Sequence, residues 1–143
     1  MKSDAIAVGA IRIQFLVDPE QAEESVSVFE CTVAAGVKVP APHSHDAFDE
    51  TIYELEGACT WTVDGNRVEL APGEALFIRR GSVHGFENEG DEPVRFLAIA
   101  SPGIFGPSYF KEVGALLANG GPPDPAEIGA VMRRHGLTPA PPG

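Results

Sequence analysis

Short runs of alternating apolar and polar residues fill the first two thirds of the chain. Ile11, Ile13 and Phe15 alternate with polar residues, and the same period returns in residues 25–33. A period of two is typical of a strand with one buried face. The pattern therefore predicts two strands here, with residues 1–10 as a loosely ordered lead-in.

Further strand-like segments follow at regular intervals, each rich in β-branched or aromatic residues and bounded by turn residues. They are residues 51–55, 58–63, 67–70, 75–78, 83–86 and 94–100. Asp64-Gly65 between two of them is a strong hairpin signal. Many short strands with regular turns predict an all-β antiparallel barrel or sandwich, not a parallel α/β sheet.

The period changes to a helical one after residue 103. An apolar stripe predicts one helix, with Ser108 as its cap: Tyr109, Phe110, Val113, Leu116 and Leu117. Asp124, followed by proline and then glutamate, predicts the start of a second helix that ends near Gly136. We expect both helices to pack on the exterior of the barrel or on a dimer mate. His135 is interpreted as a capping or surface residue, and residues 137–143 as a flexible tail.

Composition narrows the classes of function. The chain has 143 residues, a length typical of one domain, and a formal net charge of −11, which opposes binding to nucleic acid. No apolar run is long enough to span a membrane, and no signal-peptide core follows the N-terminus, so a cytoplasmic protein is expected. Cys31 and Cys59 could pair, but each lies in an apolar strand-like run without metal-type spacing, and two buried free thiols are the favoured expectation.

The candidate chemistry centres on His43-Ser44-His45, with Glu50 five residues further on and His84 in a separate turn. Residues two apart on a strand point to the same face, so both imidazoles of the pair would aim at one point. Glu50 would enter from the next strand after a turn. Imidazoles with a carboxylate suit a divalent transition metal. The alternative, surface histidines in a polar loop, is weakened by the nearby carboxylate and by His84.

These residues resemble the two sequence motifs of the cupins. The first motif is matched by Gly36, His43, His45, Glu50 and Gly57, and the second by Gly73, Gly81, His84 and Asn88. Arg79 stands where the family usually has proline, which loosens the turn before His84 but leaves that histidine in place.

The resemblance implies a single-domain jelly-roll barrel over residues 1–103, with a motif core at 36–88, and a helical extension over 104–136. It implies a metal ion held by His43, His45, Glu50 and His84, of unknown identity among Fe, Mn, Ni, Cu and Zn. It also implies a homodimer. Beyond residue 100 the chain is similar to small bacterial cupins often described as quercetin-dioxygenase-like.

Three hypotheses for function follow. The first is a metal-dependent dioxygenase for a small enolisable or aromatic substrate, with Glu50 as ligand and proton acceptor. The second is a non-redox isomerase, lyase or hydrolase that acts on an anionic metabolite, and the third is a binding module without catalysis. Six aromatic residues could supply apolar walls of the substrate site, although plain core is the favoured interpretation of each: Phe15, Phe29, Trp61, Phe77, Phe86 and Phe96.

Glu54 has two interpretations. Without a bulge, its side chain shares the inward face of the strand with Glu50 and could be a catalytic acid or base. With a bulge or the approaching turn at Gly57, it swings to solvent, and this second interpretation is favoured. Tyr53 faces away from the site, and Arg79 and Arg80 are assigned no role.

Overall fold

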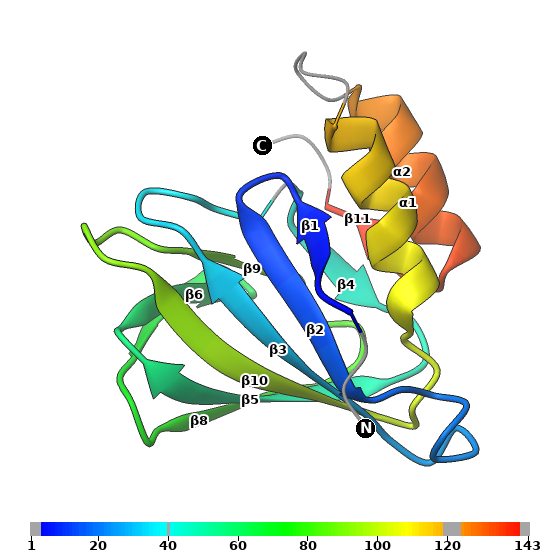
Figure 1. The fold of residues 1–143 in the computed structure, drawn as a ribbon, viewed down its shortest axis with the longest axis horizontal. Coiled ribbons are helices and arrows are strands. Elements are labelled where there is room, and N and C mark those ends of the chain that lie inside the picture. The colour runs from blue at the N-terminus through cyan, green and yellow to red at the C-terminus, as the bar shows by residue number, and fades with distance from the viewer. Residues whose placement is uncertain (1–3, 40, 119–123, 141–143) are drawn as a thin grey trace.

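The fold is a two-layer sandwich of antiparallel strands with two helices at one end (Figure 1). The structure is a computed structural model, and it describes residues 4–39, 41–118 and 124–140. Its elements are β1 (Ile6–Val8), β2 (Ile11–Val17), β3 (Ser27–Val33), β4 (His43–His45), β5 (Asp49–Glu56), β6 (Cys59–Val63), β7 (Asn66–Leu70), β8 (Ala75–Ile78), β9 (His84–Glu87), β10 (Val94–Ser101), α1 (Pro107–Leu117), α2 (Pro125–Arg134) and β11 (Leu137–Pro139).

One sheet has the order β1-β2-β3-β10-β5-β8, and the other has the order β11-β4-β9-β6-β7. The inward faces of the two sheets supply the core, as the alternation in β3 illustrates: Ser27, Phe29, Cys31 and Val33 are buried, and the residues between them are half-buried. The predicted all-β class is confirmed. Burial of the apolar surface on these faces is the main driving force for the fold, because each Å² removed from water contributes about 25 cal/mol.

Several local predictions are confirmed. Asp64 and Gly65 connect β6 and β7 with φ angles of 49° and 82°, the left-handed conformation that a tight hairpin requires. Cys31 and Cys59 are free and buried. Asp124 caps α2, because its carboxylate accepts a hydrogen bond from the Ala126 amide at 2.9 Å.

Three predictions are wrong, and they concern the lead-in, the start of α1 and the tail. The lead-in includes β1, which pairs with β2 and packs against α1. The N-cap of α1 is Gly106, without a side-chain hydrogen bond, so Ser108 lies inside the helix. Leu137–Pro139 is the strand β11, not a flexible tail, because it pairs with β4 and buries Leu137 completely. Residues 1–3 and 141–143 lie outside the described residues.

Among the described residues, no helix combines the length and apolarity needed to cross a membrane.

Candidate metal centre

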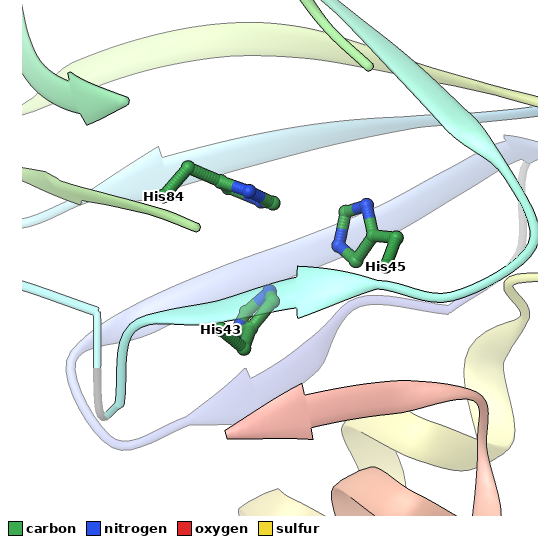
Figure 2. A group of neighbouring side chains, drawn as sticks. All are labelled: His43, His45 and His84. Carbon is green, nitrogen blue, oxygen red and sulfur yellow. The ribbon is translucent and has the colours of Figure 1, made fainter. Parts of the chain in front are cut away.

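Three histidines from two strands meet between the sheets. His43 and His45 lie on β4, and His43 is the cross-strand partner of His84 on β9. One ring nitrogen from each of the three lies within 4.8 Å of the others, and all three side chains are buried. Figure 2 shows the rings pointing toward one another. The expectation that the His43/His45 pair shares one face and that His84 arrives through the fold is realised in this cluster.

The hydrogen bonds of the cluster leave nitrogen lone pairs free. Nδ1 of His43 donates to the Ala41 carbonyl at 3.0 Å, and Nδ1 of His84 donates to the Ser82 carbonyl at 3.0 Å. Their Nε2 atoms are therefore unprotonated in the neutral rings. Nε2 of His45 is buried without a hydrogen-bond partner among the described residues.

The electrostatic environment keeps the imidazoles neutral. Burial, and then the neighbouring His84, lower the pKa of His43 to about 3. Burial and the other two histidines also lower the pKa of His45. A metal ion binds the neutral imidazole, so these residues fit a divalent metal on their donor chemistry and on the orphaned nitrogen of His45.

Glu50 lies beside the cluster but outside the compact set of three. It follows the turn after β4, as expected, and its Oε1 atom is 3.8 Å from Nε2 of His84. The carboxyl is buried, and burial raises its pKa to about 8.

A cavity of about 80 Å³ adjoins the histidines and Glu50. One water molecule requires roughly 10–15 Å³, so the cavity has room for several waters or a small organic group. Its other walls are mainly apolar and come from both sheets and from α1; the aromatic members are Phe29, Trp61, Phe86, Phe96, Phe105, Tyr109 and Phe110.

The aromatic predictions are correct in part. Phe29, Trp61, Phe86 and Phe96 line the cavity, whereas Phe15 is a buried core residue. Phe77 is 61% exposed, so both its favoured interpretation as core and its alternative as a wall are wrong.

Sequence reasoning missed the contribution of α1. Its stripe was interpreted as exterior packing, but Tyr109, Phe110 and Val113 also line the cavity, together with Phe105 just before the helix. The sequence held no separate signal for this, because the same stripe would serve a helix that only covers the barrel.

Glu54 is buried, so the favoured prediction that it swings to solvent is wrong. Its relative exposure is 0%, and neither carboxyl oxygen has a hydrogen-bond partner among the described residues. A register shift does occur, but it follows Glu54: Phe96 of β10 faces Glu54, and Arg95 faces Glu56. The extra residue is Leu55, which turns Glu56 outward and leaves Glu54 inward.

The remaining polar residues have structural roles. Arg80 forms an exposed ion pair with Asp49 at 3.1 Å. Asn88 donates to the carbonyls of Val33 and Glu92, which ties the segment after β9 to β3. His135 is the C-cap of α2, as expected, and contacts Glu112.

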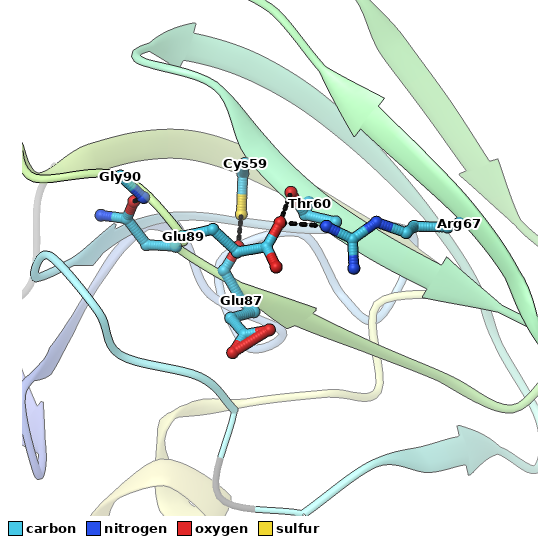
Figure 3. A network of polar contacts seen from close by, with 7 residues as sticks. Cys59, Thr60, Arg67, Glu87, Glu89 and Gly90 are labelled. Atoms are coloured by element: carbon cyan, nitrogen blue, oxygen red, sulfur yellow. Dashed lines mark hydrogen bonds and ion pairs between the residues drawn. The ribbon is translucent and has the colours of Figure 1, made fainter.

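A second network lies around the end of β9 (Figure 3). Glu89 accepts hydrogen bonds from Thr60, at 3.1 Å, and from Arg67, and Cys59 donates to the Glu87 carbonyl at 3.8 Å. These contacts join β6, β7 and the segment after β9 on one side of the barrel, where the free Cys59 thiol is buried.

Comparison with known proteins identifies the family. The profile of the Cupin domain matches residues 29–100. The chain belongs to the cupin family. This cupin is 40% identical over 60 residues to the tetracenomycin polyketide synthase protein TcmJ of Streptomyces glaucescens, a match that covers 42% of this chain and 40% of TcmJ. It is 32% identical over 72 residues to quercetin 2,3-dioxygenase of Bacillus subtilis, which covers 50% of this chain and 21% of that enzyme.

Solved structures have the same fold. The polyketide cyclase RemF from Streptomyces resistomycificus superposes with a TM-score of 0.62 and 29% identity, over 69% of this cupin and 73% of RemF. KdgF from Halomonas sp. gives a TM-score of 0.61 at 20% identity, over 70% of this cupin and 88% of KdgF. The cupin spans less than half the length of TcmJ and of quercetin 2,3-dioxygenase.

Proposed function

We propose that this cupin is a metal-dependent enzyme that acts on a small enolisable or aromatic compound, with dioxygenation as the first candidate reaction. The observation that carries the proposal is the composition of the site. Three neutral imidazoles and the Glu50 carboxyl lie at one wall of a cavity whose other walls are aromatic and aliphatic. A metal centre beside an apolar cavity suits a flat organic substrate with one oxygen function at the metal end.

The metal ligands proposed are His43, His45 and His84, with Glu50 as a fourth. A divalent transition metal held there would supply Lewis acidity and, for a redox-active ion, electron transfer. The backbone carbonyls of Ala41 and Ser82 hold two of the rings in the ligating tautomer. These two hydrogen bonds fix the orientation of the His43 and His84 rings before a metal ion binds.

Glu50 is the proposed proton acceptor for the substrate. Its Oε1 atom lies 3.8 Å from the His84 ring, so a hydroxyl or acidic C–H held near the histidines is within its reach. Removal of that proton generates the electron-rich enolate or phenolate on which both candidate reactions depend. The apolar walls exclude water from this anion and strengthen its interaction with the site.

Dioxygenation is supported by the similarity to quercetin 2,3-dioxygenase at 32% identity. A non-redox reaction, such as a cyclisation or isomerisation, is the second candidate and is supported by the similarity to TcmJ and to the polyketide cyclase RemF. A polyketide chain and a flavonol share the enolisable carbonyl group that the proposed mechanism requires, so the two candidates differ in their need for oxygen.

The test begins with metal content and oxygen uptake. Protein loaded separately with iron, manganese, nickel, copper or zinc is mixed with flavonols, catechols and β-diketones, and the variant His43→Ala/His84→Ala is the control. Oxygen consumption by the wild type alone supports a dioxygenase. Conversion of substrate without oxygen, including by the zinc form, supports the second candidate. Metal binding with ligand-dependent thermal stabilisation and no turnover would leave only a binding module. No metal in any preparation would refute the site.

A further inference from the structure

Two polar groups inside the barrel are without partners and take no part in the mechanism above. Both carboxyl oxygens of Glu54 and the indole Nε1 atom of Trp61 are buried and have no hydrogen-bond partner among the described residues. The side chains are 0% and 3% exposed. Buried polar groups in native proteins are almost always hydrogen-bonded, and a buried indole N–H normally finds an acceptor. Glu54 and Trp61 are two exceptions to this rule in one barrel, and we look for one ligand that would satisfy both.

The fold brings these two groups to the same region. Glu54 on β5 is the cross-strand partner of Phe96 on β10, and the Phe96 ring lies 5.1 Å from the Trp61 ring at 70°. Cys59 precedes Trp61 by two residues on β6. Burial and then the Glu54 charge raise the pKa of the Cys59 thiol to about 12, so Glu54 also lies near the start of β6. Phe96 is therefore beside Glu54 in the sheet and packs against the Trp61 ring, and of the two unpartnered groups Trp61 is the one that lines the cavity.

Trp61 connects this region to the metal centre. Its ring is 6.5 Å from the His84 ring and stacks on Phe86 at 5.1 Å and 18°. Trp61 also lines the cavity that contains Glu50 and the histidines. The packing of Phe86 and Phe96 against the indole fixes its orientation, so its N–H is a preorganised donor.

We propose that Glu54 and Trp61 form a second binding site in the barrel, beside the metal centre, that takes one hydroxyl group. The indole N–H is a donor only, and a carboxyl accepts in either protonation state. A hydroxyl oxygen accepts from Trp61 while its hydrogen is donated to Glu54, so one O–H group satisfies both. Phe86, Phe96 and Cys59 are the residues shown beside these two groups, and none of them offers a positive charge, which favours an uncharged ligand over an anion.

The hydroxyl has two possible sources, a buried water or a hydroxyl of the bound substrate. The second source rests on the proposed function and would make the Glu54/Trp61 site a selector for hydroxylated substrates. The binding test below needs no turnover. A failure of the Glu54/Trp61 site can therefore be distinguished from a failure of the proposed reaction.

The chain offers a direct probe, because Trp61 is its single tryptophan. The ¹⁵N-labelled protein has one indole N–H signal, which zinc, a diamagnetic ion, does not broaden. The zinc-loaded protein is titrated with phenol and with toluene, which have nearly the same size but differ in the hydroxyl group. The variants are Glu54→Gln, which keeps an acceptor, Glu54→Leu, which removes it, and Glu69→Gln at an exposed site on β7 as control.

If the substrate supplies the hydroxyl, phenol shifts the indole signal and binds about fivefold more tightly than toluene. That preference is kept in Glu54→Gln and lost in Glu54→Leu. If a retained water supplies it, the two ligands bind equally, but the indole proton shows a cross-peak to bound water that Glu54→Leu abolishes. An indole signal that responds to neither phenol nor Glu54→Leu, with no water cross-peak, overturns the proposal. If Glu54→Leu does not fold, Trp61→Phe takes its place, because it removes the indole donor and keeps an aromatic ring. A phenol preference that Trp61→Phe retains, as measured from the ligand signals, then overturns the proposal.

Discussion

Replacement of Glu54 by glutamine should change how the stability of the protein depends on pH. Glu54 is completely buried without a hydrogen-bond partner among the described residues, and desolvation raises its pKa from 4.5 to about 8. Between these two pH values the unfolded chain releases the proton while the folded protein keeps it. The folded state then binds more protons than the unfolded state, so the free energy of unfolding falls as pH rises. Glutamine has nearly the same shape and does not titrate.

The magnitude follows from the width of this window. One unit of pH is worth about 1.4 kcal/mol when a single proton separates the two states. Between pH 5 and pH 7 the wild type should therefore lose about 2–3 kcal/mol relative to Glu54→Gln. Below about pH 4 both states carry the proton, and above about pH 8 both have lost it, so the difference becomes constant at each end. Any change in packing or hydrogen bonding caused by the amide adds an offset that does not depend on pH.

The assay is urea unfolding of metal-free wild type and Glu54→Gln at about pH 5, 6 and 7, with the free energy extrapolated to water. Metal-free protein is used because Glu50 and the histidines then contribute equally to both proteins. Glu69→Gln, at an exposed position, should give a curve parallel to that of the wild type. If the curves of Glu54→Gln and the wild type are also parallel within about 0.5 kcal/mol, Glu54 is charged or solvated in the fold. The reasoning on its burial would then be wrong.

Three further predictions concern the metal centre and its supports. His84→Ala should weaken metal binding by more than about 100-fold, whereas His135→Ala should bind metal normally, as measured by metal content after dialysis. Leu137→Ala should lower the free energy of unfolding by about 2–5 kcal/mol, measured by urea unfolding, because this side chain is fully buried in β11. A smaller loss would mean that the Leu137 side chain is not packed in the core as the structure has it. Gly114→Ala should destabilise α1 packing by about 1–3 kcal/mol, since a Cβ atom would lie 2.3 Å from the Ala7 carbonyl, while Gly129→Ala in α2 should be nearly neutral because its closest contact is a flexible arginine. Thermal unfolding of the two glycine variants checks this difference.

The features that could be predicted from the sequence depend on local pattern. The period of two in β2 and β3, the Asp64-Gly65 turn and the Asp124 cap are each determined by residues within a few positions. The histidine pair was predictable for the same reason, since its spacing fixes a common face. His84 could be associated with the pair only through the spacing of the family motifs, because a distant residue has no local signal.

The features that could not be predicted depend on tertiary contacts. Leu137–Pro139 is too short to predict as a strand and ends in proline, and it becomes one because it pairs with β4. That pairing places β11 directly beside His43 and His45, so β11 supports the histidine cluster. In the same way, Tyr109 and Phe110 share a stripe that any packed helix would have. Only the position of α1 beside β1 directs them to the cavity.

The wrong prediction for Glu54 shows that one extra residue in a strand changes which face the following side chain takes. Glu54 and Glu56 have the same parity and would point to the same face of an unbroken β5. The extra residue Leu55 separates them, so Glu56 is exposed and Glu54 faces the core. A leucine at position 54 would suit that environment far better than an unpaired acid, which costs stability at neutral pH. A buried residue that lowers stability, as Glu54 does, is expected where a binding or catalytic site requires its functional group. The cost predicted for Glu54 and the hydroxyl site proposed for Glu54 and Trp61 are therefore two consequences of its place on the inward face of β5, which it shares with Glu50 and Ile52.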